Sequence, residues 1–161
     1  MEAPNILIEN QVPKMLPTQV IKKKTKQILN ALGYDDHEMS IVLTDDKTIQ
    51  QLNGQYRGID KPTNVLAFPM QEGEFSQVTP TLLGDLVISC ETAALESKQS
   101  GITLEERLSQ LLVHGTLHLV GFDHEKSEAD ARKMEDKSIS ILRQIEKNKT
   151  PLHSENCGGF F

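Results

Sequence analysis

The segment that most constrains this chain lies between positions 114 and 124, where three of its five histidines fall. His114 and His118 stand four residues apart, so on a helix of about 3.6 residues per turn both imidazoles lie on one face. Gly121 follows, and glycine readily ends a helix because it adopts the left-handed conformation at low cost. The chain can then turn back and present His124 from a loop. The segment therefore predicts a helix that ends near Gly121 and a third histidine that returns towards the first two.

Three histidines in this arrangement are typical of a catalytic zinc site. Each imidazole can bind zinc at roughly 2.0–2.1 Å, and three protein ligands leave a fourth position for water. Zinc held by neutral imidazoles can lower the pKa of a bound water to about 7. A single histidine is more often a packed or solvated residue, but here the helix spacing, the glycine stop and the third ligand agree. We therefore expect His114, His118 and His124 to bind one Zn²⁺ per chain.

The residue after the first histidine argues against peptide hydrolysis. The spacing of the motif is similar to that of metzincin proteases, in which a glutamate follows the first histidine and acts as general base. Here that position is Gly115, which has no side chain to accept a proton. We therefore expect metzincin-like geometry without the peptidase base, and a metallopeptidase is the less favoured alternative.

Composition favours one domain, which we expect to span residues 1–147, followed by a disordered tail at 148–161. No apolar run is long enough to cross a membrane, and the N-terminus lacks the features of a signal peptide. The two cysteines are Cys90 and Cys157, and the second lies in a glycine-rich tail. We expect no structural disulfide, a packing role for Cys90 and a cytoplasmic location.

The charge balance limits how the chain could bind nucleic acid. A formal net charge of −6 argues against a general nucleic-acid coat, which needs an overall basic face. Local basic groups are still present: one cluster contains Lys22, Lys23, Lys24 and Lys26, and a smaller one contains Arg57 and Lys61. The lysine run is expected on a solvated helix face.

The hydrophobic pattern predicts an α+β domain: a small mixed four-stranded sheet packed with about five helices. The central helix carries the histidine motif and begins at a capping box formed by Thr103 and Glu106. Thr18 is predicted to cap the first helix, and residues 53–63 are predicted to form a turn-rich loop. The predicted strands are 5–9, 38–44, 64–68 and 82–88; the predicted helices are 18–32, a short helix after Asp45 or Asp46, 90–98, 103–120 and one that starts at Ser127.

Two further segments, joined to the histidine motif, resemble the YbeY family of bacterial metal-dependent endoribonucleases. They are Tyr56–Pro69, with the sequence YRGIDKPTNVLAFP, and Leu83–Ile88, with the sequence LGDLVI. The resemblance covers most of residues 5–147. Ala67 and Phe122 depart from it, since the family usually has Ser and Tyr there, but neither is a proposed ligand.

The resemblance implies a zinc-dependent, single-strand-specific endoribonuclease that acts in maturation of the 16S rRNA 3′ end and in ribosome quality control. Its implied partners are ribosomal RNA and proteins of the small ribosomal subunit; the oligomeric state is left open. It also implies that Arg57 is functional, alongside the three histidines. A non-catalytic ribosome assembly factor with a structural zinc is the alternative, and the open fourth coordination position argues against it.

The chemistry of phosphodiester cleavage suggests roles for the remaining candidates. Negative charge gathers on the non-bridging oxygens, and a guanidinium can bind two of them. Arg57 could supply it, although chemistry alone equally allows a surface arginine. We assign Arg57 and His114 to catalysis and Arg57 and Lys61 to RNA binding. Asp123 could orient a ligand histidine or cap the turn. Asp85 needs a partner, either structural or at a ligand histidine. No residue is identified as the general base.

Overall fold

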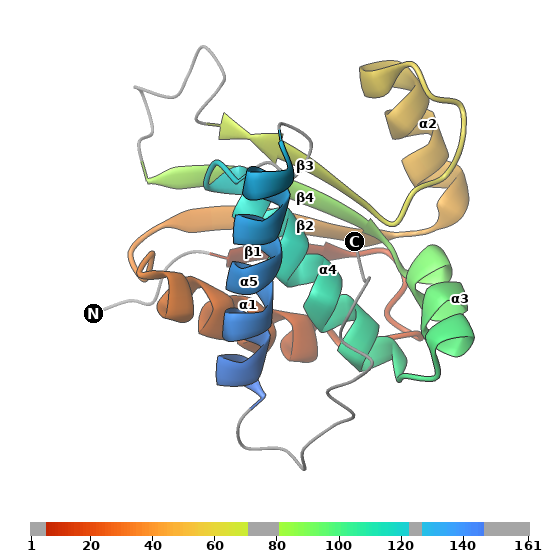
Figure 1. Ribbon diagram of the computed structural model, residues 1–161. Helices are drawn as coiled ribbons and strands as arrows, with labels where there is room; N and C mark the ends of the chain where they lie inside the picture. The colour runs from red at the N-terminus through yellow and green to blue at the C-terminus, as the bar shows by residue number, and fades with distance from the viewer. Residues whose placement is uncertain (1–5, 71–80, 123–126, 147–161) are drawn as a thin grey trace.

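The computed structural model describes residues 6–70, 81–122 and 127–146. Within them the chain forms four strands and five helices (Figure 1). The strands are β1 (Ile6–Asn10), β2 (Glu38–Thr44), β3 (Val65–Pro69) and β4 (Leu82–Ser89). The helices are α1 (Thr18–Leu32), α2 (Asp46–Arg57), α3 (Cys90–Ser100), α4 (Leu104–Leu119) and α5 (Glu128–Ile145). The predicted tail at 148–161 lies outside the described residues, and the single domain at 1–147 stays a prediction.

The four strands form one mixed sheet in the order β1-β2-β4-β3. β1, β2 and β4 run parallel, and β3 pairs antiparallel with β4 at the edge of the sheet. The predicted mixed α+β fold with four strands and five helices is therefore confirmed. Metzincin-like geometry is a finer statement, which the arrangement of these elements does not test.

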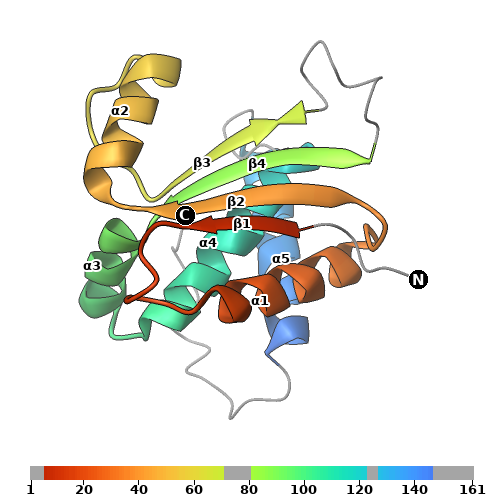
Figure 2. The same cartoon turned by 180° about the vertical axis from the view of Figure 1, so that it is seen from behind.

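One face of the sheet carries most of the core. Alternate strand residues such as Ile41 and Leu86 point to this face and pack against α1, α4 and α5 through Ile28, Leu112 and Met134. Figures 1 and 2 show these three helices together on one side of the sheet. Burial of this apolar surface is the main stabilising contribution.

The opposite face carries a smaller cluster under α2. Ile49 of α2 packs there with Leu66 of β3 and Val87 of β4. α2 therefore stands on the side of the sheet away from α4 (Figures 1 and 2). The edge strand β3 lies between the two helices.

The predicted central helix is confirmed as α4. The Thr103 hydroxyl accepts from the Glu106 backbone N–H at 3.0 Å, and the Thr103 N–H donates to the Glu106 carboxylate at 2.8 Å, so the predicted capping box forms. Ten residues of α4 are buried, because the helix packs on both the sheet and its neighbouring helices. This burial fixes the part of α4 that carries the histidines.

The predicted loop at 53–63 is wrong over its first five residues, because α2 continues to Arg57. Asn53 and Gly54 suggested a turn, but Asn53 is only 2% exposed and its side chain donates to the Lys61 carbonyl at 2.9 Å. The helix ends instead at Gly58, which adopts a φ of 71° in the left-handed region that favours glycine.

The predicted cap of the first helix is also wrong. Pro17 occupies the N-cap position, and Thr18 is already the first helical residue. The Thr18 hydroxyl accepts instead from the side-chain amide of Asn10 at 3.2 Å, and the same amide donates to the Leu16 carbonyl at 2.8 Å. Asn10 therefore fixes the approach to α1, a tertiary contact that local sequence does not indicate.

The lysine run does not form one solvated face. Lys24 is 6% exposed, and its ammonium lies 3.3 Å from the Glu105 carboxylate at the start of α4. A buried ammonium needs such a partner because desolvation of the charge is costly. Lys24 therefore connects α1 to α4 and is not available to a polyanion.

Candidate active site

His114 and His118 lie together at the C-terminal end of α4, as their spacing predicts. Their ring centroids are 4.7 Å apart and their planes meet at 84°. Both side chains are partly buried, and the Nδ1 atom of His114 is fully so. The pair thus presents two imidazoles side by side on a well-packed helix, a donor set that suits zinc.

The helix ends as expected and reverses the chain just beyond the histidines. The Gly121 N–H donates to the His118 carbonyl at 3.1 Å, and the Phe122 N–H donates to the Leu117 carbonyl at 3.0 Å. Gly121 has a φ of 105°. These two bonds with a left-handed glycine form a Schellman motif. The helix therefore ends directly after the histidine pair, as return of a third ligand would require.

The predicted third ligand, His124, lies outside the described residues, as does Asp123. Among the residues that are described, no group of three His, Cys, Asp or Glu side chains could hold a metal ion. The pair His114 and His118 fits a zinc site in the nature of its donors and in their proximity. Occupancy of that site and the role of His124 stay predictions.

The packing around position 115 favours glycine, the residue that the histidine motif has there. A Cβ atom at this position would lie 2.7 Å from Leu86 Cδ2 and 3.3 Å from Val65 Cγ2. Helix α4 therefore lies directly on β3 and β4 beside the histidine pair. A glutamate at position 115 would fit only if the Leu86 and Val65 side chains shifted, so the packing favours the glycine that stands in place of the metzincin general base.

Arg57 is placed on a different element from the histidines. It is the last residue of α2 and is exposed. Because α2 packs on the face of the sheet opposite α4, Arg57 and the histidine pair lie on the two sides of β3. The structure thus does not bring Arg57 into contact with the histidines, and β3 is the element that separates them.

The loop after α2 is held by two side chains of that helix. The amide of Asn53 donates to the Lys61 carbonyl at 2.9 Å, and the amide of Gln50 donates to the Asp60 carboxylate at 3.0 Å. The Lys61 side chain is exposed. These bonds order the backbone between Arg57 and Lys61, although both cationic side chains face solvent.

Asp85 has a structural partner. It pairs in register with Ser40 of β2 and Phe68 of β3, and the Ser40 hydroxyl donates a short hydrogen bond to its carboxylate. Residues at this register share the face of the sheet that carries Val87, opposite α4. Of the two roles left open by the sequence, the structure supports the structural one and places Asp85 away from the histidine pair.

A polar network on α3 and α4 was not predicted from the sequence. Arg107 is 7% exposed and donates to the Glu96 carboxylate at 3.0 Å and to the side-chain amide oxygen of Gln110 at 2.6 Å. Glu96 also accepts from the Asn64 amide at 3.3 Å. The network joins α3, α4 and the start of β3. The sequence carries one signal for this network: Arg107 and His114 are seven residues apart, a spacing that places both side chains on one face of α4.

Cys90 is a packing residue, as expected. It is fully buried, and burial raises the pKa of its thiol to about 11. A thiol with so high a pKa holds little thiolate near neutral pH, and the thiolate is the nucleophilic form. Cys90 therefore does not act as a catalytic nucleophile.

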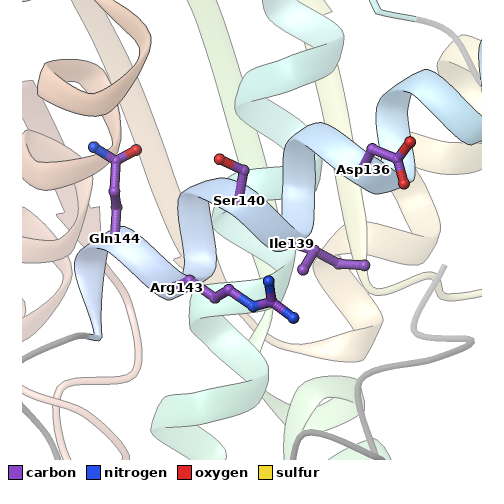
Figure 3. Close-up of a pocket in the computed structure, with 5 residues that line it drawn as sticks. All are labelled: Asp136, Ile139, Ser140, Arg143 and Gln144. Atoms are coloured by element: carbon purple, nitrogen blue, oxygen red, sulfur yellow. The ribbon is translucent and has the colours of Figure 1, made fainter.

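A groove of about 560 Å³ lies along the outer side of α5. The described residues that line it all come from that helix and are labelled in Figure 3: Asp136, Ile139, Ser140, Arg143 and Gln144. None of them is a candidate ligand or a candidate RNA-binding residue. The histidine pair on α4 therefore stays the candidate active site.

Comparison with known proteins supports the resemblance found in the sequence. The family model described as Endoribonuclease YbeY matches residues 6–146. A protein of Geobacter sulfurreducens named Endoribonuclease YbeY is 48% identical over 130 residues, which cover 80% of this chain and 87% of that protein. A protein of the same name from Syntrophotalea carbinolica is 43% identical over 142 residues, covering 87% and 95% of the two chains.

A solved structure agrees at the level of the fold. The solution structure of a Thermotoga maritima protein matches with a TM-score of 0.60 and 25% sequence identity, over 89% of each chain. Fold and histidine-bearing helix together define an α+β protein with a candidate metal site on its central helix. The family match is more specific: the chain belongs to the endoribonuclease YbeY family, whose members are enzymes that cleave RNA phosphodiester bonds.

Proposed function

We propose that the protein is a zinc-dependent endoribonuclease, specific for single-stranded RNA, with one zinc ion per chain. The observation that carries this proposal is the His114–His118 pair, whose ring centroids lie 4.7 Å apart at the end of α4 in a chain of the endoribonuclease YbeY family. His124 would complete the ligand set from the segment after the Schellman turn. The metal would supply Lewis-acid activation of water and of a phosphoryl oxygen near neutral pH.

The two helical histidines would bind the metal as neutral imidazoles with fixed orientation. Burial of α4 along ten of its residues holds their backbone in place, and the capping box at Thr103 secures the other end of the helix. Preorganised ligands of this kind lose little conformational entropy on binding. Gly115 lets α4 approach the sheet beside them and supplies no carboxylate at that position.

Arg57 and Lys61 would bind the phosphates of the substrate. Both are exposed, and Arg57 can donate two parallel hydrogen bonds to a phosphate. Because β3 is the edge strand between α2 and α4, an RNA strand that crosses this edge would contact Arg57 on one side and the histidine pair on the other. A flexible single strand can make such a bend more easily than a stiff duplex, which favours single-stranded RNA.

The cellular role that we propose is processing of ribosomal RNA at the 3′ end of 16S rRNA, together with ribosome quality control, in the cytoplasm. None of the helices within the described residues is long and apolar enough to cross a membrane. The net charge of −6 gives weak general attraction for RNA, so we propose that proteins of the small ribosomal subunit contribute to substrate selection.

A cleavage assay on one RNA oligonucleotide, free and annealed to its complement, tests this proposal. We expect cleavage of the free strand only. Arg57→Ala should lower the rate by about 10²–10³-fold, the usual effect of removing one preorganised donor, and should leave the thermal midpoint unchanged because the side chain is exposed. An equal rate for Arg57→Ala and wild type, purified in parallel, would indicate contaminating ribonuclease or a non-catalytic assembly factor.

A further inference from the structure

We propose that the ring of Tyr56 is a stacking platform for one base of single-stranded RNA, beside the phosphate contacts of Arg57. This inference rests on the proposed function and adds a residue that positions the substrate. The relevant surface, which we call the α2 tip, consists of residues 56–61, from the end of α2 to Lys61.

Tyr56, the second-last residue of α2, is unusually exposed for an aromatic side chain. It retains 61% of its surface accessible, although it lies next to the apolar cluster under α2. Scattered exposed hydrophobic residues are normal on protein surfaces, and Leu95 on α3, at 57% exposed, is one of them. Tyr56 differs because it is fixed by a neighbouring ring and flanked by exposed cations.

The neighbouring ring is that of Phe68 on β3. The two ring centroids are 5.3 Å apart and the planes meet at 70°, an edge-to-face contact of the favourable kind. Phe68 itself packs against the cluster of Ile49, Leu66 and Val87. The Tyr56 ring is therefore held in place by the sheet, while most of its surface stays free to contact a ligand.

The backbone beyond Tyr56 is closed by hydrogen bonds. The Gly58 N–H donates to the Gly54 carbonyl at 3.1 Å, and the Ile59 N–H donates to the Asn53 carbonyl at 3.3 Å. The Asn53 amide then holds the Lys61 carbonyl at 2.9 Å. These contacts order the α2 tip, so that binding of a ligand there needs little further ordering of the backbone.

The charges at the α2 tip suit a polyanion. Arg57 and Lys61 are exposed, and the one carboxylate of the segment, Asp60, accepts a hydrogen bond from Gln50 at 3.0 Å. Two cations therefore stand against one partly satisfied anion, in a chain whose overall charge is −6. This local reversal of sign distinguishes the α2 tip from the bulk of the surface.

An aromatic ring beside basic side chains is the combination that binds single-stranded nucleic acid. The cations contact phosphates, and a base stacks on the ring with little dependence on sequence. Stacking requires an unpaired base, because the bases of a duplex already stack on one another. The α2 tip would thus favour single-stranded RNA and set the position of the strand that crosses β3.

Binding of a fluorescein-labelled single-stranded RNA, followed by fluorescence anisotropy, tests this inference. Tyr56→Ala should weaken binding by about 5- to 100-fold, as alanine substitution of a stacking residue usually does. Tyr56→Phe should bind within about twofold of wild type because stacking does not need the hydroxyl. Tyr56→Leu keeps an apolar contact with Phe68 and should bind as weakly as the alanine variant. Leu95→Ala is the control for loss of an exposed hydrophobic side chain.

A second measurement reports the ring directly. The chain has no tryptophan and two tyrosines, so Tyr34→Phe leaves Tyr56 as the only strong intrinsic fluorophore. Stacking of a base on this ring should quench its emission when unlabelled RNA is added, and annealing the RNA to its complement should abolish the effect. A purely structural role for Tyr56 would give no such quenching.

The outcomes separate this inference from the proposed function. Wild-type affinity in Tyr56→Ala or Tyr56→Leu, with normal cleavage, would overturn the stacking role and leave the endoribonuclease proposal standing. Loss of affinity for a ribosomal protein alone would make the α2 tip a protein interface and would also overturn it. A wild-type protein that neither binds nor cleaves single-stranded RNA would overturn both.

Discussion

Gly115 and Leu86 approach so closely that a Cβ atom on Gly115 would lie 2.7 Å from Leu86 Cδ2. This contact sets the distance between α4 and the sheet at the point where α4 carries the histidine pair. Any larger side chain at position 115 would have to displace the Leu86 side chain. Position 115 therefore matters for the packing of α4 on the sheet and for the absence of a general base beside the histidines.

Gly115→Ala should therefore destabilise the protein. The added methyl group overpacks a core contact, at a cost of about 1–3 kcal/mol, which exceeds the gain of up to about 1 kcal/mol in helix propensity. The free energy of unfolding in urea measures the difference. Leu86→Ala in the same chain should make the substitution at 115 less costly, because it removes the atoms that the methyl group meets.

Gly54→Ala is the matched control. Gly54 is also helical, but a Cβ atom there would meet nothing closer than the Ile59 carbonyl oxygen at 3.7 Å. We expect it to stabilise the protein by about 0.5–1 kcal/mol through helix propensity alone. Equal effects of alanine at 54 and 115 would contradict the packing role of Gly115.

The start of α2 should make stability depend on pH. The Asp45 carboxylate accepts from the Thr48 N–H at 2.9 Å, and this backbone bond holds the pKa of Asp45 below its usual value of 3.8. A depressed pKa in the folded state gives stability that is present above the unfolded pKa and is lost as the pH falls through the folded pKa. The stability advantage of wild type over Asp45→Asn, from urea unfolding, should shrink below about pH 4; an advantage that grows in acid would refute this.

The thiol of Cys90 should not react with thiol reagents while the protein is folded. Its pKa of about 11 leaves about one thiolate in a thousand at pH 8, and burial blocks access to the sulfur. In Cys157→Ser, where Cys90 is the remaining thiol, Ellman's reagent should titrate no group until a denaturant is added. Rapid reaction of the native variant would show that Cys90 is accessible.

Local signals in the sequence predicted the helix that bears the site. The capping box at Thr103, the apolar face of α4 and the stop at Gly121 each act within one or two turns, so the sequence contains them in full. The spacing of His114 and His118 fixes their common face for the same reason. The family resemblance added Arg57, which the residues alone left open.

Features that depend on tertiary contacts could not be predicted in this way. The side of the sheet that Asp85 faces follows from strand register, which requires the partner strands. Burial of Lys24 follows from the position of Glu105 on another helix. α2 extends past Asn53, and the Asn53 amide donates a hydrogen bond to the Lys61 carbonyl. Local helix propensities do not include such a bond.

The zinc content of the purified protein, measured on the same preparations as cleavage of single-stranded RNA, tests the central claim most directly. We predict one zinc per chain and cleavage for wild type, and loss of both in His118→Ala. His37→Ala, which changes a histidine bonded to Asp36 at 2.9 Å and remote from α4 in the sequence, should keep both. Full cleavage by metal-free His118→Ala would contradict the account.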